Sequence, residues 1–300
     1  MGVVVEAALA REEAGGGLIA ALRPKQWVKN VLVAAAPLAA GAIFEPTVAV
    51  AVVVAFVAFS LAASAGYLVN DLADVEEDRR HPTKRLRPLA SGRVSPRTAV
   101  VVAVLLAVAS LGLAAALSTP GLVAVLAVYL VLTTSYSLWL KHQPVIDLAI
   151  VSSGFLLRAM AGGLASHIPL SQWFLIVAAF GSLFVVAGKR YSELVSHPDA
   201  GTRKSLDSYT PGYLRFVWSI SAGVTITAYC LWAFQVDVNG TPVAWGPVSV
   251  APFVLALLRY AVDVDHGRAG DPEQIVWSDR VLQALVLIWL VTFGIGAFGA

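Results

Sequence analysis

The chain has 300 residues, of which 58% are hydrophobic and only 13% are charged. A water-soluble protein of this length could not bury so much apolar surface, so the composition excludes a soluble fold and indicates a membrane protein. The formal net charge of +2 says little as a total, but the position of each charge along the chain is informative. The single cysteine, Cys230, excludes a disulfide within the chain and a site built from several cysteines.

Residues 1–22 contain acidic residues and three consecutive glycines, without the basic-then-apolar pattern of a signal peptide. We expect a flexible cytoplasmic tail there, followed by a single catalytic domain over residues 23–300. This domain opens with residues 23–30, where a tryptophan and two lysines suit the headgroup zone of a bilayer.

Nine apolar stretches follow, each near the roughly 20 residues that a helix needs to cross about 30 Å of hydrocarbon. We predict an all-α fold with membrane helices at 31–44, 47–69, 98–117, 121–140, 145–165, 170–188, 213–235, 247–262 and 280–298. With nine helices, every Lys and Arg except Arg158 falls in the tail or near the loops after the second, fourth, sixth and eighth helices. Such loops face the cytoplasm. We therefore predict a multi-pass protein of the plasma (inner) membrane with its N-terminus cytoplasmic and its C-terminus outside.

An acidic stretch lies where the second apolar segment ends. On a helix, Asp71, Asp74 and Asp78 share one face, with Asn70 and Glu77 at its borders. Carboxylate and amide oxygens on one stripe attract a hard divalent cation such as Mg²⁺, which can bridge phosphate oxygens. The alternative is a solvated loop of mixed charge, but carboxylates in helical register beside a membrane helix favour a metal–phosphate site.

A basic run follows at once: Arg79, Arg80, Lys84, Arg85, Arg87, Arg93 and Arg97. Beside a membrane helix, anionic headgroups and substrate phosphates explain such a run better than nucleic acid does. The five histidines have no ligand spacing, which argues against zinc. The sequence contains no phosphate-binding glycine motif before a helix, and its spacing suggests no Ser-His-Asp arrangement.

Two charged groups fall in or beside later membrane segments. Asp147 and Arg158 are 11 residues apart on the fifth helix, so they share a face but lie about 16 Å apart along the axis. We predict that Arg158 meets an anion in a polar cavity open to the cytoplasm; the alternative is a structural arginine that binds helix carbonyls. Lys189, Arg190 and Glu193 follow the sixth helix and are either a second half-site or residues that extend to lipid headgroups.

These features resemble the UbiA-type superfamily of intramembrane prenyltransferases. Asn70-Asp71-x-x-Asp74-x-x-x-Asp78 is similar to its first metal-binding motif, and Arg-Pro-Leu-Ala-Ser-Gly at 87–92 resembles the usual end of that loop. The resemblance covers residues 23 to 298 and implies a nine-helix bundle around a cytoplasm-facing polar cavity, with Mg²⁺ bound to a diphosphate and Mn²⁺ as an alternative metal. Members normally carry a second Asp-rich motif after the sixth helix, where this chain has Lys189, Arg190 and Glu193.

Three segments resemble the decaprenyl-phosphate phosphoribosyltransferase branch: 23–30, Tyr136-Ser137-x-x-x-Lys141 and Gly188-Lys189-Arg190-Tyr191-x-Glu193. That likeness implies transfer of 5-phosphoribose from phosphoribosyl diphosphate to a polyprenyl monophosphate in arabinan precursor synthesis for the cell wall. Extra cations in place of a second acidic motif suit the added phosphates. The acceptor phosphate is already an anion at neutral pH, so this reaction needs no general base.

We predict that Asp71, Asp74 and Asp78, with Asn70, are the catalytic metal–diphosphate ligands. The other predicted substrate contacts are Lys29, Asn30, Lys84, Arg85, Arg87, Tyr136, Lys141, Arg158, Lys189 and Arg190, with Lys25 and Gln26 as weaker candidates. Expected partners are phosphoribosyl diphosphate, a polyprenyl phosphate and membrane lipids, and no nucleic acid; the sequence leaves a homo-oligomer open. The rival functions are a conventional prenyltransferase that uses a polyprenyl diphosphate, and a transporter or lipid-binding protein without catalysis.

Overall fold

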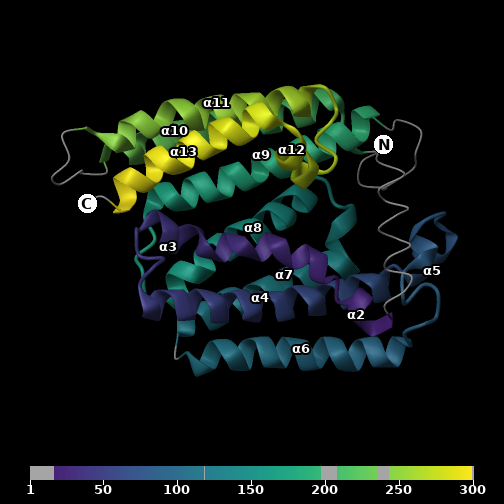
Figure 1. The fold of residues 1–300 in the computed structure, drawn as a ribbon. Helices are drawn as coiled ribbons and strands as arrows, with labels where there is room; N and C mark the ends of the chain where they lie inside the picture. Colours follow the sequence, from purple (N-terminus) through teal and green to yellow (C-terminus); the bar gives the residue numbers. More distant parts are fainter. Residues whose placement is uncertain (1–16, 118, 197–207, 236–242, 299–300) are drawn as a thin grey trace. The chain divides into compact units, whose positions relative to one another are not determined.

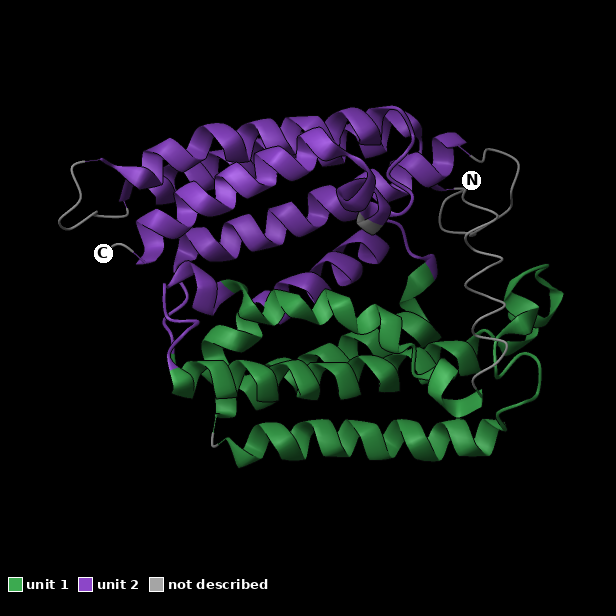
Figure 2. Cartoon of the chain, viewed as in Figure 1, with its two compact units in different colours: residues 1–35, 46–141, 160–167 green, residues 36–45, 142–159, 168–300 purple. Residues whose placement is uncertain are grey.

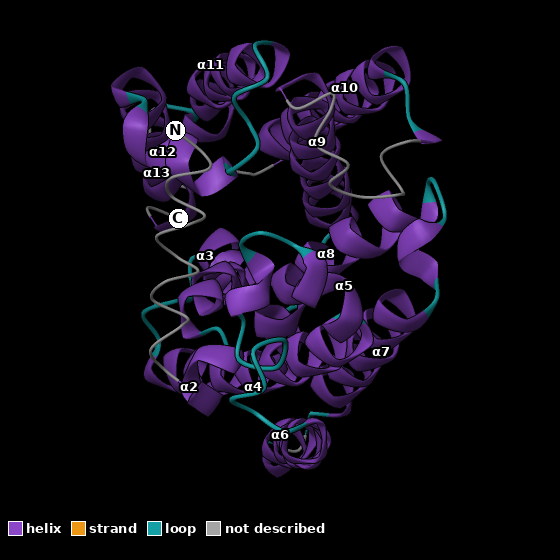
Figure 3. Ribbon diagram, turned by 90° about the vertical axis from the view of Figure 1, so that its right-hand side faces the viewer, coloured by secondary structure: helices purple, strands orange, loops and turns teal. Residues whose placement is uncertain are grey.

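A computed structural model describes residues 17–117, 119–196, 208–235 and 243–298. All regular structure in these ranges is helical, which confirms the all-α prediction (Figure 1, Figure 3). The chain separates into two compact units, drawn in green and purple in Figure 2. Unit 1 comprises residues 1–35, 46–141 and 160–167, and unit 2 comprises 36–45, 142–159 and 168–300. The single catalytic domain over 23–300 stays a prediction.

Eight helices in the described ranges are long and apolar enough to cross a bilayer. They are α4 (Pro46–Ala73), α6 (Pro96–Ala116), α7 (Pro120–Leu138), α8 (Ile146–Ala165), α9 (Gln172–Ser196), α10 (Pro211–Gln235), α11 (Trp245–Asp265) and α13 (Arg280–Phe298). The shorter helices are α2 (Gly17–Ala21), η1 (Pro24–Ala34), α3 (Ala35–Ala39), α5 (Val75–Arg80), η2 (Lys84–Leu86), η3 (Leu140–His142) and α12 (Pro272–Ser278).

The eight long helices match the second to ninth predicted spans, and proline explains several of their starts. Helices α4, α6, α7, α10 and α12 all begin with proline, whose fixed φ suits the first helical position and whose missing N–H costs no hydrogen bond there. At α6, the Ser95 side chain also accepts a hydrogen bond from the Thr98 N–H. One boundary differs clearly: the sixth helix is predicted to end at residue 188, but α9 continues to Ser196 and carries Lys189, Arg190 and Glu193.

The first predicted span, 31–44, is not one α-helix. Residues 24–34 form the 3₁₀-helix η1, which runs antiparallel to α4: Trp27 Nε1 donates to Ser64 Oγ at 3.0 Å, and Asn30 Nδ2 donates to Ser60 Oγ at 3.0 Å. A 3₁₀-helix rises about 2.0 Å per residue, so a short segment of this kind reaches further than an α-helix of equal length. The count of eight long helices leaves this segment out, and nine crossings stay a prediction.

Of the predicted tail, residues 1–16 lie outside the described residues. Its end forms α2, whose Ala21 is buried against Leu68 of α4 and Leu89 of the following loop. Within unit 1, α4 is the central helix and packs against η1, α6 and α7. Its buried face is rich in alanine, which allows close helix approach where lipid supplies no hydrophobic force between helices.

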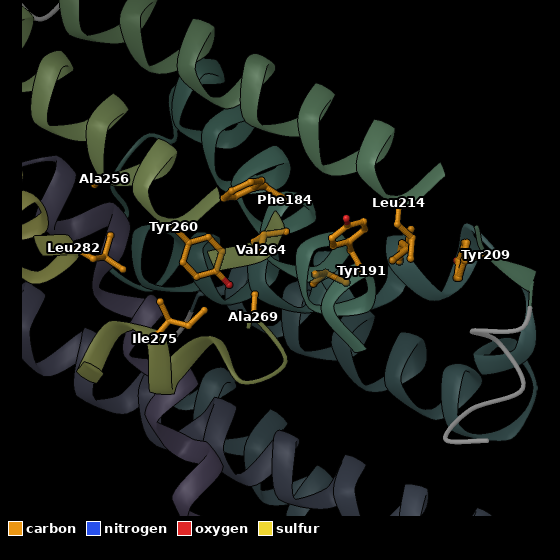
Figure 4. Packing of buried hydrophobic residues seen from close by; sticks show 12 residues of the cluster. Phe184, Tyr191, Tyr209, Leu214, Ala256, Tyr260, Val264, Ala269, Ile275 and Leu282 are labelled. Carbon is orange, nitrogen blue, oxygen red and sulfur yellow. The ribbon is translucent and has the colours of Figure 1, made fainter. Parts of the chain in front are cut away.

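Unit 2 has an aromatic-rich core formed mainly by α9, α10 and α11 (Figure 4). The Phe184 ring lies 5.6 Å from the Tyr260 ring and 6.2 Å from the Trp218 ring, both edge-on. Gly188 makes the close approach of α9 to α11 possible, because a Cβ there would lie 2.9 Å from a methyl group of Val264. The last turns of α9 are therefore held tightly against α11.

Candidate functional site

The acidic stretch spans a break between two helices of unit 1. Helix α4 ends at Ala73, α5 begins at Val75, and Asp74 lies between them with a non-helical φ of −99° and ψ of 3°. Helical hydrogen bonding nevertheless continues across the break, since the Asp74 N–H donates to the Asn70 carbonyl at 3.0 Å and the Asp78 N–H donates to the Asp74 carbonyl at 2.8 Å. The expected single helix is thus interrupted at Asp74.

Two arginines bind the buried ends of this stretch. Arg23 Nη2 lies 2.6 Å from Asp71 Oδ1, whose side chain is only 2% exposed. Arg87 Nη1 lies 2.7 Å from Asp78 Oδ2 and 3.5 Å from Asp71 Oδ1. One guanidinium thus bridges two carboxylates, which places Asp71 and Asp78 on the same side of the stretch, as the helical spacing predicts.

The middle carboxylate has partners of its own. Asp74 forms an ion pair with Lys141 from η3 and accepts a hydrogen bond of 3.2 Å from Asn70 Nδ2. The three aspartates therefore bind cations from three separate segments: the start of η1, the loop after η2, and η3. Asp71, Asp74, Asp78, Asn70, Arg87 and Lys141 come together in unit 1, whereas Glu76 and Glu77 are exposed.

The oxygen ligands at this site suit a hard cation, but in this structure the side chains are not arranged around a metal position. Across the described ranges, no group of three or more His, Cys, Asp or Glu side chains is arranged to hold a metal ion. The three carboxylates and the Asn70 amide are nonetheless the ligand types that Mg²⁺ takes, with water and phosphate oxygens completing its shell. Metal binding by them requires the carboxylates to give up their present cation partners.

Arg23 belongs to this site, although the sequence did not single it out as a substrate contact. Its backbone has a φ of 52°, in the left-handed region that non-glycine residues rarely adopt. Its guanidinium carbon also lies 5.1 Å from the centre of the Tyr67 ring. Two sequence signals involve it: segment 23–30 resembles the phosphoribosyltransferase branch, and Pro24 disfavours the right-handed helical conformation in the residue before it.

The remaining predicted contacts of unit 1 are less central in this structure. Asn30 is fully buried and attaches η1 to α4 through Ser60. Of the other four, Arg85 is exposed. The remaining three are half-buried: Lys29, Lys84 and Tyr136. Their roles stay predictions.

Unit 2 brings the predicted basic residues of α9 to carboxylates. Arg190 Nε and Nη2 lie 3.0 and 3.2 Å from the two oxygens of Asp147 in α8, and Arg190 Nη1 donates to Glu193 Oε2 at 3.1 Å. Lys189 Nζ lies 3.8 Å from Glu193 and 3.9 Å from Asp271. Nothing in the sequence indicates the Asp147–Arg190 pair, because the two residues are 43 positions apart.

The turn before Asp147 is also fixed by a side chain. Val145 has a φ of 69°, and its N–H donates to the hydroxyl of Tyr209 at 2.7 Å. Burial raises the pKa of this phenol above its usual value of 10, so Tyr209 stays neutral at physiological pH. A β-branched residue in the left-handed region is a strained conformation that its surroundings must hold.

Arg158 is buried, and its Nη1 donates to the Gly154 carbonyl one turn earlier in α8 at 2.7 Å. This contact is of the kind expected for a structural arginine, while the predicted contact with an anion stays untested. The described pocket of unit 2 lies between α8, α9 and α10 and is mainly apolar, with Leu148, Phe180 and Val217 in its lining. It is not the polar cavity that we predicted.

Comparison with known proteins places the chain in a family. Residues 30–278 match the model of the UbiA prenyltransferase family. The chain belongs to the UbiA prenyltransferase family. With eight apolar helices and this membership, it is an integral membrane protein.

Several UbiA family relatives are similar over nearly their whole length. A decaprenyl-phosphate phosphoribosyltransferase of Mycobacterium tuberculosis is 56% identical over 290 residues, covering 94% of this chain and 95% of the relative. One of the same name from Corynebacterium glutamicum is 54% identical, covering 91% and 84%. A UbiA homologue from Archaeoglobus fulgidus, solved with DMAPP and Mg²⁺, matches with a TM-score of 0.71 over 95% of this chain and 100% of that chain; at 17% identity it shows the fold alone.

Proposed function

We propose that this protein transfers 5-phosphoribose from phosphoribosyl diphosphate to a polyprenyl monophosphate, decaprenyl phosphate, and releases diphosphate. The observation that carries the proposal is the 54–56% identity, over nine-tenths of the chain, to relatives named decaprenyl-phosphate phosphoribosyltransferase. The acidic stretch of unit 1 and its cations support it, because they offer carboxylates for a metal and positive groups for phosphates.

The reaction exchanges one bond for another at the anomeric carbon of ribose. The bond from this carbon to the diphosphate oxygen breaks, and a bond to an oxygen of the lipid phosphate forms. Positive charge develops on the ribose and negative charge on the departing diphosphate. The attacking oxygen is already ionised, so no residue has to remove a proton from it.

We propose that Asp71, Asp74 and Asp78, with Asn70, hold Mg²⁺ on the diphosphate. The bound ion would neutralise the charge that builds on the leaving group. Arg23, Arg87 and Lys141 then serve as phosphate contacts, since guanidinium and ammonium groups bind phosphate oxygens in charge-assisted hydrogen bonds. The further substrate contacts in this proposal are Lys29, Asn30, Lys84, Arg85, Tyr136, Arg158 and Lys189.

Membrane placement is part of the proposal. With a cytoplasmic N-terminus, the acidic stretch lies on the cytoplasmic side, where it can bind phosphoribosyl diphosphate from the cytoplasm. The C-terminus then lies outside. Labelling of single introduced cysteines at the two ends in intact cells checks this, after replacement of Cys230. Modification of the N-terminal site by an impermeant reagent would contradict it.

The direct test is incubation of membranes containing the protein with Mg²⁺, decaprenyl phosphate and phosphoribosyl diphosphate labelled in the ribose. We expect label to enter the organic phase with the lipid. Transfer seen only with a labelled polyprenyl diphosphate and another acceptor would support a conventional prenyltransferase instead. No transfer with either donor would favour a protein without catalysis.

The metal assignment has a separate test. Asp74→Ala should abolish turnover while the protein stays folded in detergent, because the Asp74 side chain is 20% exposed and its described contacts are polar, with Lys141 and Asn70. Glu76→Ala is the matched control, since Glu76 is an exposed carboxylate that pairs only with the surface residue Arg79. Near-normal turnover of Asp74→Ala, equal to that of the control, would remove the metal assignment.

A further inference from the structure

A chain of ionic contacts in unit 2 runs from a fully buried carboxylate to the surface. Its side chains become steadily more exposed: Asp147 at 0%, Arg190 at 4%, Glu193 at 25%, Lys189 at 35% and Asp271 at 54%. These residues come from α8, from the last turns of α9, and from the turn before α12. The sequence suggested Lys189 and Arg190 as equivalent phosphate contacts, but their surroundings differ sharply.

Arg190 is placed as an internal partner. Its Nε and Nη2 face both oxygens of Asp147, and its Nη1 faces Glu193, so these carboxylates use all three nitrogens of the guanidinium. Bidentate pairing of this kind fixes the orientation of both groups. A phosphate bound at Arg190 Nε or Nη2 would have to displace the fully buried Asp147 carboxylate, which costs several kcal/mol in a dry interior.

Lys189 is placed differently. Its ammonium lies 3.8 Å from Glu193 Oε1 and 3.9 Å from Asp271 Oδ1. These are ion-pair distances longer than hydrogen bonds, so the two carboxylates hold the ammonium electrostatically at a position open to solvent. Glu193 is the link, because its two oxygens contact Arg190 on one side and Lys189 on the other.

We infer that Arg190 is a positioning residue and that Lys189 is the α9 residue that contacts a substrate phosphate. Asp147 fixes Arg190, Arg190 fixes Glu193, and Glu193 together with Asp271 holds the Lys189 ammonium in place for the phosphate. The rigid turn before α8, where Val145 is bound by Tyr209, anchors the buried end of this chain. The inference rests on the proposed function, because it assigns roles in binding the proposed donor, phosphoribosyl diphosphate.

Burial energetics support a positioning role. A fully desolvated ion pair gives little or no net stability compared with apolar side chains of similar volume. Unit 2 has an extensive apolar core in which such side chains would pack. The gain from the pair is therefore orientation: it keeps the Glu193 carboxylate in a single arrangement next to Lys189 and Asp271, the two most solvent-accessible of these five side chains.

The test is whether the KM for phosphoribosyl diphosphate rises or falls when the Glu193 carboxylate is removed. Phosphoribosyl diphosphate is a polyanion, so removing a carboxylate near its site should improve binding if charge alone matters. If Glu193 positions Lys189, Glu193→Gln should instead raise the KM for phosphoribosyl diphosphate by about 5- to 10-fold, with kcat and the KM for decaprenyl phosphate little changed. Initial rates of the full-length protein in nanodiscs, with each substrate varied in turn, measure this.

Additivity identifies the residue through which Glu193 acts. Lys189→Gln should raise the same KM by about 10-fold or more, and adding Glu193→Gln to it should produce no further increase. Asp265→Asn is the matched control, because Asp265 is another carboxylate of unit 2 and its described ion pair is with Arg215. Its KM values should equal those of the unaltered protein.

The buried pair is tested by replacing both members with apolar residues. Asp147→Leu combined with Arg190→Met should leave the melting temperature near that of the unaltered protein while raising the KM for phosphoribosyl diphosphate about 10-fold. If this double variant does not fold, Glu193→Gln still decides, since it leaves the buried pair intact.

An unchanged or lower KM in Glu193→Gln would overturn the inference, as would fully additive effects of Lys189→Gln and Glu193→Gln. These outcomes differ from failure of the proposed function, in which the unaltered protein itself transfers no ribose phosphate.

Discussion

Units 1 and 2 each bury an aspartate against an arginine, but the two pairs are built from different kinds of partner. In unit 1, Asp71 is buried while its partners Arg23 and Arg87 are 17% and 19% exposed and belong to segments outside the long helices. In unit 2, Asp147 and Arg190 are both buried and both belong to membrane helices. Arg23 and Arg87 are partly exposed and can turn toward an incoming phosphate, whereas Arg190 is buried and held by Asp147 and Glu193. An aspartate–arginine pair of the first kind suits substrate binding in unit 1, and one of the second kind suits the positioning of neighbouring side chains in unit 2.

The largest expected effect tests the unit 1 side of this comparison. Arg87→Gln removes the guanidinium that bridges Asp71 and Asp78, and we expect kcat/KM for phosphoribosyl diphosphate to fall by at least about 100-fold. Arg79→Gln is the control, because Arg79 pairs with exposed Glu76 and should change kcat/KM less than about twofold. Equal activity of both variants would show that the bridge serves no catalytic purpose.

Arg158 is the next test, since it is a buried arginine of α8 whose described contact is structural. Arg158→Ala should lower turnover by at least about 10-fold if the arginine meets a substrate phosphate as proposed. Thermal melting of the purified protein supplies the second reading. A lower melting temperature with unchanged turnover at a permissive temperature would assign Arg158 to helix packing.

A smaller effect is expected for Arg23, which has an aromatic neighbour as well as an acidic one. Arg23→Gln removes a positive charge beside Asp71, so we expect weaker binding of phosphoribosyl diphosphate, with KM raised about 10-fold. The same change should tighten the binding of Mn²⁺ alone, measured by electron paramagnetic resonance, because Asp71 loses its competing cation. Arg97→Gln, which removes an exposed charge at the start of α6, should do neither.

The smallest effect concerns an ion pair at the surface of unit 2, which serves as a reference for the buried one. Burial alone would raise the pKa of Asp279, but hydrogen bonds from Arg259 and from the Leu282 and Val281 N–H groups outweigh burial and hold this pKa below its usual value of 3.8. A lowered pKa means that the ionised form stabilises the fold above about pH 3.8 and that this contribution is lost as the pH falls further.

Asp279→Asn should therefore lower the melting temperature slightly at pH 7, by no more than about 2 °C, and this difference should shrink as the pH falls below about 3.8. Melting curves of both proteins across this range measure it. A difference that grows as the pH falls would contradict the assigned sign.

The sequence predicted the long helices well, because lipid imposes a length and an apolar composition that can be read directly from the chain. It also predicted that Asp71 and Asp78 lie on one side of the acidic stretch, because the two are close in sequence; their role as metal ligands stays a prediction. It missed the Arg23–Asp71 and Asp147–Arg190 pairs, which join positions 48 and 43 residues apart. Such pairs depend on how helices pack, and helical periodicity within one segment carries no information about a distant partner.

The sequence also could not distinguish η1 from an α-helix, because both place apolar residues on one side. The difference matters for this segment's tolerance to change. Trp27, Asn30 and Val33 face α4 at intervals of three residues, which is one full turn of a 3₁₀-helix. One inserted residue would rotate everything before it by about 120° and carry Arg23 away from Asp71, whereas three inserted residues would restore its direction. Arg23 can therefore stay beside Asp71 only if the length of this segment changes in whole turns of three residues.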